Sequence, residues 1–304
     1  MEAYTDFAGV YDIFMDNTPY GEWADYIAGL LDEYGVSQGE GLSAEEEQNL
    51  PEAELVRLRA LAAERNVVVE LGCGTGSLTE LLADKGYDMI GIDSSQEMLN
   101  IAQEKKEKSG KEILYLLQDM RELELYGTAG AVVSVCDSLN YLLEEEDLLQ
   151  TFRLVNNYLY PGGVFIFDFN TVYKYETLIG NSTIAENREE CSFIWENYYD
   201  AEGQMNEYDL TVFVRLQEGM PEDGEKGDGI FRRFTETHYQ RGYTLEQMRT
   251  LVEQAGMELI KAVDADTHGE VREESGRIYV IARESGKKVC KEILSGQSTP
   301  AKNF

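Results

Sequence analysis

Short apolar runs and amphipathic segments alternate through the middle of the chain. Each run is bounded by turn-forming residues, and most are followed by a segment with the apolar spacing of a helix. The predicted strands are 67–70, 89–92, 113–117, 131–135 and 164–167, and the predicted helices are 77–85, 96–108 and 145–160. Strands that alternate with helices are typical of a parallel sheet with helices on its faces, so we expect an α/β fold.

The pattern changes after residue 170. The segments 193–199, 206–216 and 230–240 are long, aromatic and β-branched, and they are separated by a turn at Gly203 and an acidic loop at 218–229. This succession predicts an antiparallel meander inserted into the α/β domain.

The α/β pattern resumes after the insertion. Thr244-Leu245-Glu246-Gln247 fits a capping box that opens a helix to about residue 255, and strands are predicted at 259–263 and 278–282. We therefore expect an α/β domain from 1–170 and 241–284, an inserted antiparallel β lid at 171–240, and a tail at 285–304.

Aromatic and apolar residues in 7–31 have mostly helical spacing, interrupted at Asn17-Thr18-Pro19. Two short helices covering the α/β domain fit this spacing better than a strand. Residues 39–52 are polar and acidic and predict a solvated loop, before a helical pattern resumes at Leu55.

Composition excludes several classes of protein. Among 304 residues, 43% are hydrophobic and the net charge is -32, so a polyanionic nucleic acid is an unfavourable partner. The four cysteines and two histidines lack the spacing of metal ligands, so no metal is expected. The chain shows neither a signal peptide nor a long apolar span, so we expect a cytoplasmic protein without a membrane partner. No pattern indicates an oligomeric state.

The chemistry centres on the turn Glu70-Leu71-Gly72-Cys73-Gly74-Thr75-Gly76 between a strand and a helix. Glycines there allow a tight turn and the close approach of a ligand, and Asp93 ends the next strand, where nucleotide-binding domains place an acid for ribose hydroxyls. A dinucleotide fingerprint would need glycine at position 77, which is Ser77. The Glu70 carboxylate would repel a pyrophosphate and attract an ammonium group, which indicates an adenosine carrying cationic groups.

These features resemble the class I S-adenosylmethionine-dependent methyltransferases, and the N-terminal motif is similar to that of a bacterial subgroup of small methyltransferases. The resemblance implies a seven-stranded Rossmann-like sheet with an antiparallel last strand, and S-adenosylmethionine (SAM) as cofactor. The residues that carry it are 67–76, Gly91-Ile92-Asp93, Gln118-Asp119-Met120, 159–163, and Phe7-Ala8-Gly9-Val10-Tyr11-Asp12 with Pro19-Tyr20 and Trp23.

The resemblance also implies roles for single residues. Glu70, Gly72 and Gly74 would lie against the methionine part of SAM, Asp93 would bind the ribose, Met98 would flank the adenine, Asp119 and Met120 would recognise its edge, and Tyr11 and Trp23 would cover the cofactor. The full set expected at the cofactor is Tyr11, Trp23, Glu70, Gly72, Cys73, Gly74, Gly76, Asp93, Ser94, Met98, Asp119, Met120 and Cys136.

Several of these residues have a structural alternative. Met98 fits a helix core as well as an adenine wall, Tyr11 and Trp23 fit simple hydrophobic packing, and Asp119 fits a solvated turn. Ser94 and Glu97 also fit a capping box.

Methyl transfer is an in-line displacement that requires a positioned acceptor, exclusion of water and, where needed, a proton acceptor. Ligands of open α/β sheets lie at the carboxyl ends of the strands, which makes Asp137 and Asp168 candidates for orienting the acceptor, with helix cap or turn former as the alternative. His238 on the last inserted strand is a candidate base or a structural residue. Weaker candidates of the same kind are Glu196, Tyr198 and Arg233.

We therefore predict a SAM-dependent methyltransferase that acts on a small molecule. No Asn-Pro-Pro-Tyr element follows the fourth strand, so the pattern resembling methylation of DNA amino groups is missing. The alternatives are methylation of protein or RNA, a nicotinamide-dependent oxidoreductase, and a protein that binds SAM without turnover. Ser77 and Glu70 disfavour the oxidoreductase.

Overall fold

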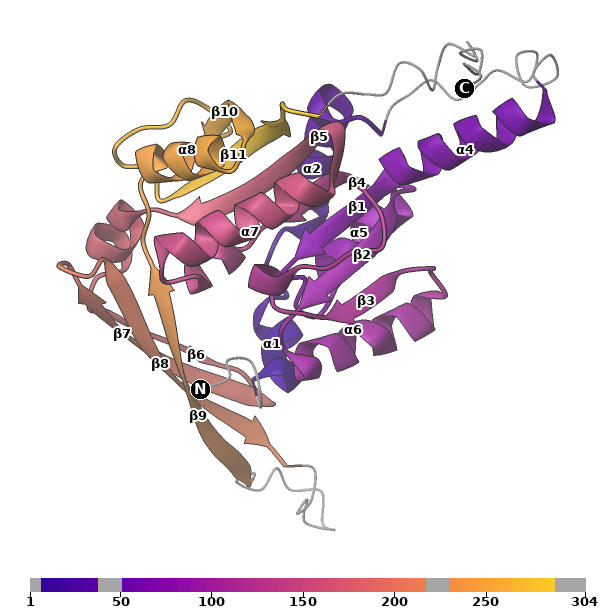
Figure 1. The fold of residues 1–304 in the computed structure, drawn as a ribbon. Helices are drawn as coiled ribbons and strands as arrows, with labels where there is room; N and C mark the ends of the chain where they lie inside the picture. The colour runs from indigo at the N-terminus through magenta and orange to yellow at the C-terminus, as the bar shows by residue number, and fades with distance from the viewer. Residues whose placement is uncertain (1–6, 38–50, 217–229, 288–304) are drawn as a thin grey trace.

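A seven-stranded sheet forms the centre of the protein (Figure 1), as seen in a computed structural model that describes residues 7–37, 51–216 and 230–287. The strand order is β3-β2-β1-β4-β5-β11-β10. The first five strands pair in parallel, whereas β11 is antiparallel to both β5 and β10. The strands are β1 (Val67–Leu71), β2 (Asp88–Asp93), β3 (Leu114–Leu117), β4 (Ala129–Ser134), β5 (Leu159–Asn170), β10 (Met257–Asp264) and β11 (Arg277–Glu284). The expected α/β fold with an antiparallel last strand is confirmed.

Helices cover both faces of this sheet. Alternate residues of β1 point to opposite faces, so Val69 packs with α7 and α8 while Val68 packs with α2, α5 and α6. Both cores consist of buried side chains, nearly all of them aliphatic or aromatic. The helices are α1 (Ala8–Phe14), α2 (Tyr20–Tyr34), α4 (Glu52–Asn66), α5 (Ser77–Asp84), α6 (Gln96–Ser109), α7 (Glu145–Tyr158) and α8 (Leu245–Gln254).

A second, four-stranded antiparallel sheet projects from the first, as Figure 1 shows. Three of its strands match the predicted meander, and the fourth, β6, was not predicted. Most side chains of β6 are exposed, so it lacks the apolar alternation that marks a half-buried strand. The strands are β6 (Thr183–Asn187), β7 (Cys191–Asp200), β8 (Met205–Arg215) and β9 (Phe231–Arg241).

Helix α1 joins this second sheet to the central domain. Val10 packs with Tyr208, Leu210 and Val212 of β8. On its other side, Asp12 pairs with Lys105 of α6 at 2.7 Å. Helix α1 therefore contacts the second sheet and a helix of the central domain.

Two local predictions differ from the structure. The cap of α6 is Ser95, whose side chain accepts a hydrogen bond from the Met98 amide, so the predicted Ser94–Glu97 capping box is wrong. The helix predicted at 145–160 ends at Tyr158, and residues 159–163 form an irregular stretch within β5, because Ala129 pairs with Leu159 and Ala131 already pairs with Val164.

The predicted capping box at Thr244 is confirmed, since both of its reciprocal hydrogen bonds with Gln247 are present. The predicted loops at 39–52 and 218–229 and the tail at 285–304 lie almost wholly outside the described residues. Within the part of the chain that the structure describes, no helix is long and apolar enough to cross a membrane. No His, Cys, Asp and Glu side chains of that part are grouped as metal ligands.

Gly130 provides a test of this packing. A Cβ atom at this position in β4 would lie 1.8 Å from the Arg65 carbonyl oxygen, so Gly130→Ala must displace the end of α4 from the sheet. We expect a loss of roughly 1–3 kcal/mol in the free energy of unfolding, measured by urea denaturation. Gly127→Ala is the control, because its Cβ would meet nothing within 4 Å. Equal stability of the two variants would contradict this packing.

Candidate functional site

A cavity of about 640 Å³ opens at the carboxyl ends of β1, β2 and β4. Its lining includes every residue expected at the cofactor except Trp23 and Gly76, among the residues that the structure describes. The residues predicted from separate motifs therefore meet at one place. This edge of the sheet is where open α/β folds bind their ligands.

The glycine-rich turn forms the floor of the cavity. Gly72, Gly74 and Gly76 all have positive φ angles, of 70°, 54° and 74°. A Cβ atom at Gly76 would lie 2.3 Å from the Tyr115 hydroxyl, whereas a Cβ at Gly74 would meet nothing within 4 Å. Gly76 is thus required by packing beneath the turn, and Gly74 leaves open space where a ligand can approach the backbone.

Asp93 connects the turn to α6. One carboxylate oxygen accepts a hydrogen bond from the Gly74 amide at 2.7 Å, and the other accepts one from the Ser95 amide at 2.8 Å. Each carboxylate oxygen can accept more than one hydrogen bond, so Asp93 can hold the turn and also bind ribose hydroxyls. Burial raises its pKa.

Glu70 is buried beneath the same turn, with only 3% of its surface exposed. The Thr79 hydroxyl donates a hydrogen bond to it, yet burial raises the pKa of Glu70 to about 8. A cation beside a buried carboxyl group stabilises its ionised form. These residues therefore fit SAM, because the ammonium group of its methionine part would compensate the charge of Glu70.

Helix α1 covers the cavity through a polar junction. Asp12 accepts a hydrogen bond from the Thr75 hydroxyl at 2.6 Å, and Lys105 donates to Thr75 and Ser77 at 3.0 and 2.8 Å. This junction places Tyr11 in the cavity wall.

The cover also includes a residue to which the sequence assigned no role. Tyr20 lines the cavity, whereas Trp23 packs against the Tyr20 ring at 5.4 Å and the Arg277 guanidinium at 5.7 Å. Trp23 thus supports the wall from behind. The Pro19-Tyr20 motif was the only sequence signal for Tyr20.

At the far end, Asp119 and Met98 line the cavity together. Arg121 holds both carboxylate oxygens of Asp119, and these hydrogen bonds lower the pKa of that carboxyl group. Met98 is 2% exposed, so it belongs to the helix core and also faces the cavity.

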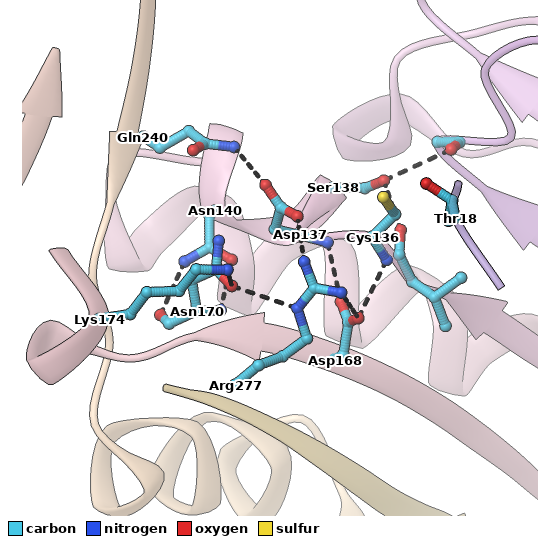
Figure 2. Close-up of polar contacts among 12 residues, drawn as sticks. Thr18, Cys136, Asp137, Ser138, Asn140, Asp168, Asn170, Lys174, Gln240 and Arg277 are labelled. Carbon is cyan, nitrogen blue, oxygen red and sulfur yellow. Dashed lines mark hydrogen bonds and ion pairs between the residues drawn. The ribbon is translucent and has the colours of Figure 1, made fainter. Parts of the chain in front are cut away.

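The loop after β4 has a strained backbone held by the buried Asp168 and by the partly buried Asp137 and Arg277 (Figure 2). Cys136 and Asp137 have φ angles of 61° and 54°, which are unusual outside glycine. The carboxylate of Asp168 accepts hydrogen bonds from both of their amides, at 3.0 and 2.9 Å, and Arg277 pairs with Asp137 and Asp168 at 2.9 and 3.6 Å.

Of the three residues predicted to be catalytic, none lines the cavity. Asp168 is fully buried, and its carboxylate accepts hydrogen bonds from the loop after β4. Asp137 also accepts a hydrogen bond from Gln240 at 2.7 Å. His238 is 1% exposed and lies behind Tyr141, which does line the cavity. The weaker candidates Glu196, Tyr198 and Arg233 are exposed on the second sheet.

Glu70 predicts a pH dependence of stability. Its pKa is about 8 in the folded protein against an ordinary value of 4.5, so the folded state binds more protons than the unfolded state between these values. The contribution of Glu70 to the free energy of unfolding is therefore largest below about pH 4.5 and is lost as pH rises towards 8, by at most roughly 1.4 kcal/mol per unit. We expect Glu70→Gln to flatten the decline measured by urea denaturation of the unliganded protein. The exposed Glu97→Gln should leave it unchanged, and a slope in Glu70→Gln equal to that of the wild type would disprove the assignment.

Comparison of the sequence and of the fold with known proteins identifies similar methyltransferases. Residues 68–163 match a family model described as a methyltransferase domain. The chain is 33% identical over 283 residues to the "Putative methyltransferase YqeM" of Bacillus subtilis (strain 168), a match that covers 93% of this chain and 97% of that protein. A S-adenosylmethionine-dependent methyltransferase from Clostridium acetobutylicum ATCC 824 has a crystal structure with a TM-score of 0.72 and 26% identity, covering 94% of this chain and 100% of that one. The chain belongs to the class I SAM-dependent methyltransferases.

Proposed function

We propose that this methyltransferase transfers the methyl group of SAM to the amino group of a small molecule. The observation that carries the proposal is the continuity of the cavity wall. The wall runs from Glu70 and Asp93, which suit the donor, to Cys136 and Tyr141 after β4, and Tyr141 contacts His238 of β9. The acceptor would bind at this second end. We also propose that the enzyme acts in the cytoplasm, as expected from the sequence.

The cover over the cavity favours a small acceptor. Helix α1 is fixed to the turn by Asp12 and to the second sheet by Val10, and Tyr11 between them lines the cavity. A macromolecular acceptor would have to insert a side chain or base beneath this helix. The charge of -32 further disfavours RNA.

The charge of the cavity lining favours an amine as the methyl acceptor. Among the described residues, the lining holds the carboxyl groups of Glu70, Asp93, Glu97 and Asp119, and its one arginine, Arg121, pairs with Asp119, so the cavity as a whole is acidic although three of these groups belong to the donor end. Such a lining attracts cations.

Two proteins that match part of this chain also favour an amine as the acceptor, because their names describe methylation of nitrogen. One is a dTDP-3-amino-3,4,6-trideoxy-alpha-D-glucopyranose N,N-dimethyltransferase of Streptomyces venezuelae, 30% identical over 139 residues, 46% of this chain and 55% of that protein. The other is a glycine/sarcosine N-methyltransferase of Halorhodospira halochloris, 30% identical over 103 residues, 33% of this chain and 38% of that protein. Both names describe small acceptors.

The test combines binding with an acceptor screen. Calorimetric titration should show binding of SAM and S-adenosylhomocysteine but not NAD, and Asp93→Asn should weaken SAM binding by about 10- to 100-fold through loss of charge-assisted hydrogen bonds. Asp88→Asn, at an exposed position of the same strand, is the control. Thermal unfolding of both variants identifies any loss of folding.

The screen uses methyl-labelled SAM with glycine, sarcosine, amino-sugar nucleotides and their hydroxyl analogues, a peptide mixture and RNA. We expect label to be transferred to an amine. Transfer only to hydroxyl compounds, peptide or RNA would contradict the proposed acceptor.

A further inference from the structure

The contact between the two sheets contains a buried chain of proton-carrying groups, formed by Tyr141, His238 and Glu236. We propose that Tyr141 is the catalytic residue that takes the proton from the acceptor amine, and that His238, oriented by Glu236, receives the Tyr141 proton in turn. This inference rests on the proposed function, because it assigns the proton transfer that methylation of an amine requires.

Geometry connects the three groups in order. The Tyr141 hydroxyl lies 3.1 Å from Nδ1 of His238, and Nε2 of the same ring lies 3.4 Å from the Glu236 carboxylate. His238 and Glu236 are two residues apart on β9 and so point to the same face of the sheet. Tyr141 comes from the 3₁₀ segment Ser138–Tyr141 after β4.

Burial separates the roles. The side chain of His238 is 0% exposed and that of Glu236 is 6% exposed, whereas Tyr141 lines the cavity. An acceptor in the cavity can therefore touch the tyrosine but not the histidine. Tyr141 is the contact, and the other two act through it as positioning residues.

The carboxylate selects the histidine tautomer. One oxygen of Glu236 accepts a hydrogen bond from the Phe7 amide at 2.9 Å, and the other faces Nε2 of His238. Nε2 makes no hydrogen bond to that oxygen, but the negative charge 3.4 Å away favours a proton on Nε2, which leaves Nδ1 as the acceptor for the Tyr141 hydroxyl. This is the arrangement by which a carboxylate and a histidine activate a hydroxyl group in other enzymes.

Tyr208 holds the relay in place. Its ring stacks on His238 with centroids 4.8 Å apart and an interplanar angle of 6°, and its hydroxyl lies 2.7 Å from that of Tyr141. A phenol oxygen accepts up to two hydrogen bonds, so a contact from Tyr208 is compatible with one from the acceptor amine.

The step balances as follows. The acceptor nitrogen uses its lone pair to bond the methyl carbon while the bond from that carbon to sulfur breaks, and the released electron pair stays on the sulfur. The nitrogen loses one proton to the Tyr141 oxygen, and the Tyr141 proton passes to Nδ1 of His238, whose positive charge faces Glu236. Proton acceptance of this kind contributes about 10²- to 10⁴-fold to a rate.

The kinetic test uses Tyr141→Phe, His238→Asn and the double variant, with the most active amine among glycine, sarcosine and the amino-sugar nucleotides. We expect each single variant to lower kcat about 10²-fold or more with little change in the KM for SAM, and the double variant to be no slower than the slower single one, because the residues act as a unit. Exposed Tyr239→Phe on the same strand is the control. Retention of kcat within threefold, or multiplicative losses in the double variant, would overturn the relay.

A binding test is independent of the acceptor. In sinefungin a carbon that bears an amino group replaces the methylated sulfur of SAM, so the amine lies at the place of the transferred methyl group, next to the acceptor site. We expect Tyr141→Phe and Glu236→Gln to weaken sinefungin about tenfold while S-adenosylhomocysteine binds within twofold of the wild type. Equal weakening of both ligands would show a merely structural role. A screen without amine methylation combined with the expected sinefungin result would refute the proposed function but retain the proton-accepting site.

Discussion

The fully buried carboxylate of Asp168, at the end of β5, accepts hydrogen bonds from two successive amides of the loop after β4 and faces the guanidinium of Arg277. An unpaired buried charge destabilises a protein by about 3–5 kcal/mol, so each partner is needed by the others. The same bonds stabilise the left-handed conformation of Cys136 and Asp137, which is unfavourable for residues other than glycine. The cavity wall from Cys136 to Tyr141 depends on this arrangement.

The arrangement also links the two sheets. Arg277 enters from β11, and Asp137 accepts a hydrogen bond from Gln240 of β9. Two residues earlier on the same strand, His238 meets Tyr141 from the loop. Asp168 therefore stabilises the conformation of the loop through its two hydrogen bonds. The loop in turn contacts β9 through Asp137 and Tyr141, and these contacts fix the distance between Tyr141 and His238. Burial raises the pKa of Asp168 despite the nearby Arg277.

Short-range patterns allowed much of the fold and the donor half of the site to be predicted. The five parallel strands follow from apolar runs between helices, and the Thr244 capping box follows from four adjacent residues. Glu70 and Gly74 lie on one turn, and Asp93 ends the neighbouring strand, so the spacing of a βαβ unit is sufficient to bring them together.

Interactions between distant segments escaped prediction. Arg277 is 140 residues from Asp137 along the chain, and Tyr141 is 97 from His238, so no local periodicity connects them. β6 is mostly exposed and has no apolar face to reveal it. Ser94 and Ser95 are both suitable caps, and only the backbone path of the helix start distinguishes them. Trp23 has the aromatic character expected of a cofactor cover, but it packs against Arg277 and is not among the residues that line the cavity.

The two halves of the site thus depend on different kinds of interaction. The donor half is formed largely by backbone: three glycines with positive φ angles, and a carboxylate bonded to two amides. A site formed by backbone atoms accepts few residue types at each position, so it can be recognised as a motif in the sequence. The proposed acceptor half depends on the side chain of Tyr141 in the cavity wall and on His238 and Glu236 behind it, which meet across a sheet-to-loop contact. Side chains on such a surface can change without altering the fold, so the acceptor can vary among proteins that share this sheet, while the loop held by Asp168 continues to present a wall to the methyl donor.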